Sequence, residues 1–229
     1  MKRLLLIFLI CSASANGEVV DKSSVFAKMK VEYQVVLPQN YDPARAYPGV
    51  LAFVGGRQSL EMVRREVDRT WKPEAERRGY IVVMPAAPDG QLFFQGGGRV
   101  FPEFLQQILK DYKIEGGKFH IAGHSNGGIS AFHVAARHPE YFRTITGFPG
   151  YLPEDNNANM DRIKPMCIFL HVGQRDSGWE TEMRVQTEQF QKRGLRVRFQ
   201  IEPNQDHLIQ TLQGTGVRRL FEQFESCKN

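Results

Sequence analysis

The chain has 229 residues, of which 41% are hydrophobic and 24% charged, and its formal net charge is +5. This composition is ordinary for a globular domain and excludes a disordered or low-complexity chain. Its length suits one domain with a sizeable buried core. The basic residues are scattered among acidic ones, so we expect no nucleic-acid partner.

The first fifteen residues have the pattern of a cleaved signal peptide. Lys2 and Arg3 precede an apolar run at 4–11, and residues 13–15 match a small-residue cleavage site. Cleavage lowers the formal charge from +5 to +3, because both basic residues leave with the segment. The apolar run is too short to span a bilayer. We therefore expect a secreted or periplasmic protein without stable membrane insertion.

The remaining sequence alternates between predicted strands and helices. Residues 16–29 form a polar leader, and residues 30–229 are expected to fold as one domain. Apolar runs predict strands at 30–37, 49–54, 80–84, 119–122, 142–148, 166–172 and 195–201. Helical spacing predicts helices at 60–71, from Pro73 to Gly79, from Pro102 to a cap at Gly116-Gly117, and at 126–138, 179–194 and 208–224. Segments 85–100 and 149–164 are expected to be loops, the second a loop or a small lid.

This alternation predicts an α/β fold. We expect a mostly parallel central sheet with helices on both faces and no large cap domain. In such a sheet, ligands bind at the carboxyl ends of the strands. The candidate residues for chemistry all follow predicted strands, which supports a single site at that edge.

The most informative segment is GHSNGG at residues 123–128, between a predicted strand and a predicted helix. A G-x-S-x-G sequence in that context is typical of a nucleophile elbow, a tight turn that exposes a serine hydroxyl. Gly123 and Gly127, two residues on either side of Ser125, leave room where strand and helix cross. The alternative is a glycine-rich connection with an incidental serine. The flanking elements favour Ser125 as a nucleophile.

A serine nucleophile needs a base and a group that orients the base. Among six histidines, His207 is favoured because it follows the last predicted strand, where a loop can bring it over the serine. Asp176 directly follows the strand at 166–172 and is the candidate acid. The order serine, aspartate, histidine matches that of hydrolases with this architecture. The alternatives are a surface or helix-capping role for His207 and a helix-capping role for Asp176.

The tetrahedral intermediate of acyl transfer requires backbone N–H groups as an oxyanion hole. One N–H is expected from Asn126, immediately after the serine. The second is expected from the glycine-rich loop after residue 54, where we choose Gly56, with Arg57 as the alternative. An ordinary glycine turn would explain that loop equally simply.

Two cysteines, Cys167 and Cys227, remain after signal cleavage. In an oxidising compartment they could pair and tie the last helix to the sheet. Cys167 lies in an apolar run, however, and could equally be a small buried residue. Both readings stay open from the sequence.

Four segments carry a resemblance to a known family: YQVVLPQNYDPARAYPGVLAFVGG, RRGYIVVMPAAP, FHIAGHSNGGISAFHVAARHPEYF and FLHVGQRDSGW. With them the chain resembles the α/β-hydrolases, and in particular the small secreted esterases grouped with polyhydroxybutyrate depolymerases and feruloyl esterases. The resemblance covers about residues 32–224. It implies an acyl-transfer site of serine, aspartate and histidine that uses no metal or organic cofactor, and a small-molecule or polymeric ester as substrate.

The sequence therefore predicts hydrolysis of carboxylic esters through an acyl-enzyme on Ser125. Phe93, Phe94, Trp179 and the loop 149–164 could line an acyl or aromatic pocket, although the three aromatic side chains could equally be core residues. Two alternatives have the same fold. One is a serine peptidase, and the other is a catalytically inactive hydrolase domain that acts as a binding module.

Overall fold

The computed structural model describes residues 17–227, so the expected signal segment 1–15 lies outside the described residues. Its centre is an eight-stranded sheet in the order β1-β2-β4-β3-β5-β6-β7-β8. The first two strands are antiparallel to their neighbours, and the other six run parallel. The strands are β1 (Val19–Phe26), β2 (Met29–Val36), β3 (Tyr47–Phe53), β4 (Ile81–Pro85), β5 (Ile114–Gly123), β6 (Phe142–Gly147), β7 (Cys167–Gly173) and β8 (Arg196–Glu202).

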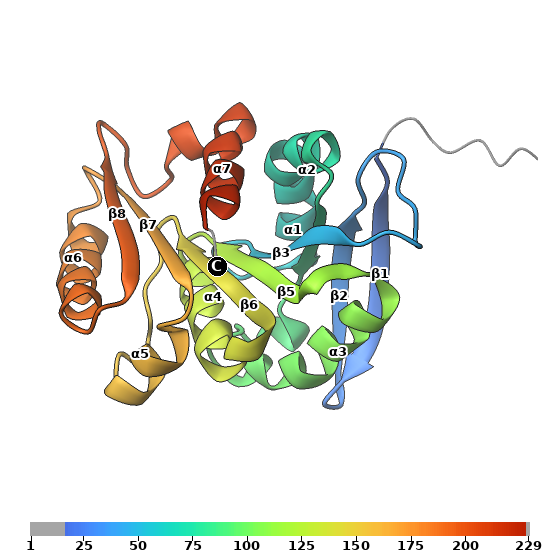
Figure 1. Ribbon diagram of the computed structural model, residues 1–229, viewed down its shortest axis with the longest axis horizontal. Coiled ribbons are helices and arrows are strands. Elements are labelled where there is room, and N and C mark those ends of the chain that lie inside the picture. The colour runs from blue at the N-terminus through green and yellow to red at the C-terminus, as the bar shows by residue number, and fades with distance from the viewer. Residues whose placement is uncertain (1–16, 228–229) are drawn as a thin grey trace, which may run out of the picture.

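Within residues 17–227, seven α-helices cover the two faces of this sheet (Figure 1). They are α1 (Leu60–Glu66), α2 (Lys72–Arg78), α3 (Phe101–Asp111), α4 (Asn126–Arg137), α5 (Asn157–Ile163), α6 (Ser177–Lys192) and α7 (Arg218–Ser226). Helices α3, α4, α5 and α6 pack on one face, where they form the larger hydrophobic cluster. Helices α1, α2 and α7 form the smaller cluster on the other face. The expected α/β-hydrolase architecture is confirmed.

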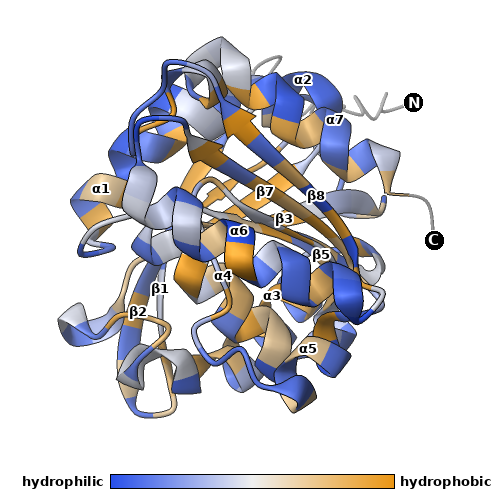
Figure 2. Cartoon of the chain, turned by 90° about the vertical axis from the view of Figure 1, so that its left-hand side faces the viewer, coloured by the Kyte–Doolittle hydropathy of each residue, from blue (hydrophilic) through white to orange (hydrophobic). Residues whose placement is uncertain are grey.

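The central strands are apolar because both of their faces are buried. Figure 2 shows hydrophobic residues concentrated in the central strands, whereas the helices contain both hydrophilic and hydrophobic residues. All five residues of β4, for example, are buried. A continuous apolar run is the expected sequence of such a strand. Within the described residues no helix is both long and apolar enough to cross a membrane.

The segment expected to be a polar leader forms a strand instead. Residues 19–26 pair along their whole length with β2, from Val19 opposite Val36 to Phe26 opposite Met29. Ala27 and Lys28, both with positive φ, make the tight turn between the two strands. Strand β1 lies at the edge of the sheet and most of its residues are partly or fully exposed. Its polar composition reflects that exposure. Because strands were expected only at apolar runs, β1 was not expected.

The helices follow the expectation only in part. Pro73 lies at the start of a second short helix, α2, as expected, but no gap separates the two helices, because a π-helical turn at Val67–Trp71 joins α1 to α2. Helix α3 ends at Asp111, and Gly116-Gly117 belong to β5. The segment 208–224 forms two short 3-10 turns before α7, and the expected lid at 149–164 contains α5.

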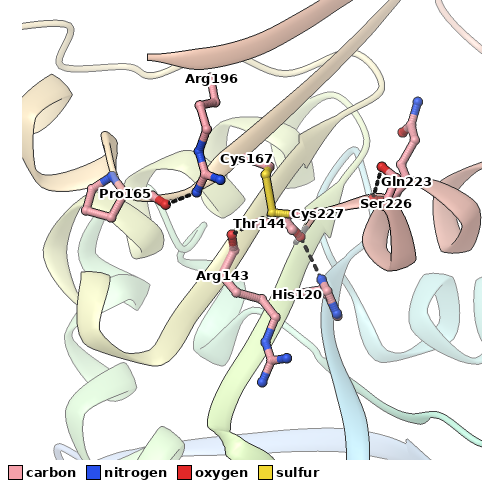
Figure 3. The surroundings of a disulfide bond; sticks show 9 residues. All are labelled: His120, Arg143, Thr144, Pro165, Cys167, Arg196, Gln223, Ser226 and Cys227. Atoms are coloured by element: carbon pink, nitrogen blue, oxygen red, sulfur yellow. Dashed lines mark hydrogen bonds between the residues drawn. A yellow bond between two sulfur atoms is a disulfide. The ribbon is translucent and has the colours of Figure 1, made fainter. Parts of the chain in front are cut away.

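A disulfide joins Cys167, the first residue of β7, to Cys227, which directly follows α7 (Figure 3). It closes a loop with a sequence separation of 60 residues. The pair therefore ties the end of the described chain to the sheet, which decides between the two alternatives left by the sequence.

Candidate active site

Ser125 stands in a strained turn between β5 and α4. Its φ of 57° and ψ of −124° lie outside the usual regions for a residue with a side chain. Packing on both sides holds the turn. A Cβ on Gly123 would lie 2.1 Å from the carbonyl oxygen of Gly127, and one on Gly127 would lie 2.3 Å from that of Phe53. The two glycines of the G-x-S-x-G motif are therefore required by close backbone approach.

The backbone of Ser125 is also fixed by hydrogen bonds. Its N–H donates to the carbonyl oxygen of Pro149 at 2.8 Å, and its carbonyl oxygen accepts from the N–H of Ile129 at 3.0 Å. The N–H of the serine is thus occupied. Any backbone donor for an anion beside the hydroxyl must come from another residue.

Ser125, His207 and Asp176 come together in one hydrogen-bonded cluster. His207 Nε2 lies 2.8 Å from Ser125 Oγ, and His207 Nδ1 lies 2.6 Å from Asp176 Oδ2. Because a carboxylate only accepts hydrogen bonds, Nδ1 carries the ring proton and Nε2 is free to accept from the serine hydroxyl. The side chain of His207 is 41% exposed and that of Asp176 only 14%. Asp176 precedes α6 but makes no side-chain capping bond to it.

The loop that carries His207 is seated directly on the loop that carries Asp176. Arg175 N–H donates to the carbonyl oxygen of Gln205 at 2.9 Å. A Cβ on Gly173 would lie 2.2 Å from the carbonyl oxygen of Asp206, so the last residue of β7 must be glycine for the two loops to touch. This contact sets the distance between the histidine and the aspartate.

Beneath these loops lies a buried polar cluster centred on Glu202, the last residue of β8. His171 Nδ1 lies 2.8 Å from Glu202 Oε1, and Arg219 holds both carboxylate oxygens at 2.8 and 2.9 Å. Burial raises the pKa of Glu202, but the hydrogen bonds from His171 and Arg219 outweigh it and lower the value to about 2. The carbonyl oxygen of Glu202 accepts from the N–H of Gln174 and of Gln205. Glu202 thus supports the loops of Asp176 and His207 through its backbone carbonyl oxygen.

His124, beside the serine, has a supporting contact that the sequence did not indicate. Its Nε2 donates to the carbonyl oxygen of His207 at 3.2 Å. Burial lowers the pKa of His124 to about 4, so the ring is neutral at neutral pH. Its Nδ1 lies against Gly55, where a Cβ would approach to 2.7 Å. His124 therefore connects the glycine-rich loop after β3 to the loop of His207.

The residues expected to form an oxyanion hole lie next to each other. Asn126 Nδ2 donates to the carbonyl oxygen of Gly56 at 2.9 Å, and Gly56 has a φ of +61° that favours glycine. Asn126 is the first residue of α4, so helix geometry gives its N–H no intrahelical partner. Buried Gln58 fastens the same loop through a bond to Ser130 Oγ at 3.0 Å. The Asn126–Gly56 contact and Gln58 together fix the loop against α4.

The three aromatic residues expected at a pocket lie in different surroundings. Phe93 is fully buried against Phe53 and Phe101, in agreement with the alternative that it is a core residue. Phe94 borders a surface hollow beside the end of α4 whose lining includes none of Ser125, His207 and Asp176. Trp179 differs from both, because its ring centroid lies 5.2 Å from that of His207 and 5.1 Å from that of Tyr151.

A cavity of about 320 Å³ adjoins the cluster on the side of β3 and α1. Gly55, Gly56 and His124 line it, together with Leu208, the residue after His207. Across residues 17–227 there is no group of three or more His, Cys, Asp or Glu side chains placed to hold a metal ion.

The sequence matches the family model "Putative esterase" over residues 100–223, more than half of the chain. The chain belongs to this esterase family. The matched segment contains Ser125, Asp176 and His207 and ends within α7. Family membership and fold together support a hydrolase function.

Relatives of this esterase-family chain include both esterases and peptidases. Dipeptidyl-peptidase 5 of Porphyromonas endodontalis is 26% identical over 129 residues, which are 51% of this chain and only 18% of the peptidase. A thermostable esterase of known structure has a TM-score of 0.72 at 19% identity, covering 89% of this chain and 62% of the esterase. A ferulic acid esterase has a TM-score of 0.67 at 18% identity, with 83% and 92% covered. At these identities the likeness of the structures shows the fold alone.

Proposed function

We propose that this protein is an exported serine esterase that cleaves carboxylic esters through an acyl-enzyme on Ser125. The observation that carries the proposal is the hydrogen-bonded series from Ser125 Oγ through His207 to Asp176. A serine at a strained turn, a base in contact with it and a carboxylate that orients the base are the parts that acyl transfer needs.

In the first half of the reaction, Ser125 Oγ attacks the carbonyl carbon of the ester while His207 Nε2 takes the hydroxyl proton. The N–H groups of Asn126 and Gly56 bind the resulting oxyanion, each worth roughly 3 kcal/mol of barrier. The intermediate then expels the alcohol, whose oxygen receives the proton from His207. The products of this half are an acyl-serine and a free alcohol.

In the second half, His207 removes a proton from a water molecule that attacks the acyl-serine. The second tetrahedral intermediate collapses to release the carboxylic acid, and the proton returns to Ser125 Oγ. Asp176 stays ionised throughout and stabilises the imidazolium that forms twice in the cycle. This chemistry requires no cofactor.

The sequence pattern of residues 1–15 supports export. The disulfide between Cys167 and Cys227 supports it independently, because disulfides persist mainly in oxidising compartments.

The first test is hydrolysis of p-nitrophenyl esters of graded acyl length by the mature protein and by its Ser125→Ala variant. Turnover that collapses in a folded variant supports the proposal, whereas equal turnover in both proteins overturns the role of Ser125. The peptidase alternative, favoured by the dipeptidyl-peptidase relative, is tested with dipeptidyl p-nitroanilides. Cleavage of the anilides without measurable esterase turnover would favour that alternative.

A further inference from the structure

The cavity beside the serine has an apolar floor and a cationic rim. Phe53, Trp71 and Phe148 line its floor and are at most 3% exposed. Arg65 and Arg69, both exposed, line its rim. A cavity of this kind suits a ligand with an apolar body and a negatively charged end.

We infer that this cavity holds the part of an ester substrate that carries a carboxylate group, with Arg65 and Arg69 as its binding partners. The inference rests on the proposed esterase function and adds the substrate class. The position supports it, because the same cavity is lined by Gly56 and by Leu208, which flank the reacting groups on two sides. Ser125, His207 and Asp176 do not line the cavity themselves, so a substrate bound there would extend past Gly56 and His124 to place its ester carbonyl at Ser125.

Helical spacing explains how both arginines face one cavity. They lie four residues apart, Arg65 in α1 and Arg69 in the turn at 67–71, so they project from neighbouring positions on one helical surface. The same turn carries Trp71, which forms part of the floor. Such turns inside α-helices are frequent at functional sites.

The charge balance of the cavity favours an anion. Its charged lining residues are Arg65, Arg69 and Glu66, so the formal sum is positive, and the neutral ring of His124 does not change it. Glu66 offsets one of the two arginines, which leaves one positive charge for a ligand. Over residues 17–227 neither arginine forms a close ion pair, whereas the adjacent Arg64 lies 3.5 Å from Asp21. Guanidinium groups in this setting bind carboxylates in a directed, bidentate manner.

The rival interpretation is a neutral acyl chain covered by the apolar stems of the two arginines. The experiment compares two pairs of esters, each with and without a carboxylate. Mono-p-nitrophenyl glutarate and p-nitrophenyl hexanoate place the difference on the acyl side. 4-Acetoxybenzoate and p-tolyl acetate place it on the alcohol side. The mature protein is assayed beside the Arg65→Gln/Arg69→Gln double variant, with Arg64→Gln as the matched control.

We expect the double variant to lower kcat/KM for the carboxylate member of at least one pair by about tenfold to a hundredfold relative to its neutral partner. Added salt should reduce the same preference in the unmodified protein, because the arginines are at the surface. Arg64→Gln should leave both members unchanged. Equal loss on both members of both pairs would overturn the inference and favour the neutral-chain interpretation.

A binding measurement separates this inference from the proposed function. Calorimetry of mono-p-nitrophenyl glutarate with the Ser125→Ala variant, with and without the two arginine substitutions, does not depend on turnover. Binding that weakens at least tenfold on loss of the arginines supports the cavity assignment even if no ester is hydrolysed. Binding that is equal in both backgrounds, or absent from both, overturns it. An unmodified protein that hydrolyses neither pair argues against the esterase function alone.

Discussion

Asn126 donates its side-chain amide to the carbonyl oxygen of Gly56 at 2.9 Å, and this bond joins the first turn of α4 to the loop after β3. Both residues are proposed to provide a backbone N–H for the oxyanion. The accepting carbonyl belongs to the peptide group between Gly56 and Arg57, so the bond orients the N–H of Arg57, the alternative donor, and holds the loop of Gly56 against α4 before substrate binds.

We predict that Asn126→Ala lowers kcat by about fivefold, since a net hydrogen bond is worth roughly 1 kcal/mol and the variant keeps its own backbone N–H. Steady-state hydrolysis of a p-nitrophenyl ester measures the effect. Gln106→Ala, an exposed amide on α3, is the control for unspecific loss. A kcat for Asn126→Ala equal to that of the control would show that the bond does not organise the site.

We predict that Asp176→Asn lowers kcat by roughly 10³- to 10⁴-fold without unfolding the protein. An amide would donate to His207 Nδ1 and leave the ring proton on Nε2, which then cannot accept from Ser125. The control is Asp206→Asn, because Asp206 is next to the histidine but exposed, with its carboxylate 3.9 Å from Arg175. Similar losses in the two variants would argue against the distinct role of Asp176.

Acid should destabilise the fold through its buried histidines. Burial, assisted by the charge of Arg143, lowers the pKa of His120 from 6.5 to about 3. Below pH 6.5, His120 is therefore protonated in the unfolded chain but stays neutral in the folded chain. The stability that neutral His120 contributes is complete above pH 6.5. It is lost as the pH falls toward 3, by up to about 1.4 kcal/mol per pH unit.

Urea unfolding between pH 7 and pH 4.5 measures this dependence. His120→Asn keeps a donor for the bond to Thr144 Oγ1 but does not titrate, so its free energy of unfolding should fall less steeply with acid. The comparison uses the slope, which a uniform loss of stability does not alter. Parallel slopes for the two proteins would contradict the prediction.

Loss of the disulfide should lower the free energy of unfolding by up to about 4 kcal/mol, the chain-entropy value for a loop of 60 residues. The variant is Cys167→Ser/Cys227→Ser, measured by urea unfolding with and without reductant. Reductant should bring the unmodified protein down to the stability of the variant and should not affect the variant. An unmodified protein insensitive to reductant, yet fully reduced, would rule out this contribution.

The sequence predicted the sheet core well because buried parallel strands need continuous apolar runs, such as the one that ends at Phe53. It also predicted that Ser125, Asp176 and His207 meet at one edge of the sheet, because each follows a strand and parallel strands end together. Strand β1 was not predicted, because an exposed edge strand has no continuous apolar run. Helix ends were misplaced where a glycine pair, Gly116-Gly117, resembles a cap but lies in a strand.

Residues that act through tertiary contacts gave no sequence signal. Phe93 and Phe94 are adjacent and chemically identical, and only packing decides that the first is in the core and the second at the surface. His124 contacts the backbone of a residue 83 positions away, which no local pattern encodes. Nothing in the local sequence distinguishes Arg65 and Arg69 from the other scattered basic residues, because the cavity that they line is formed by distant segments.

Strand β8 ends the sheet, and within the described chain its only partner strand is β7. Exposed Arg196 and Arg198 alternate along it with the half-buried Val197 and Phe199. An open edge is a template on which strands of other molecules can add, and a row of like charges opposes that addition. The arginines of β8 thus protect a largely apolar sheet from aggregation at the one margin where the parallel strands stop.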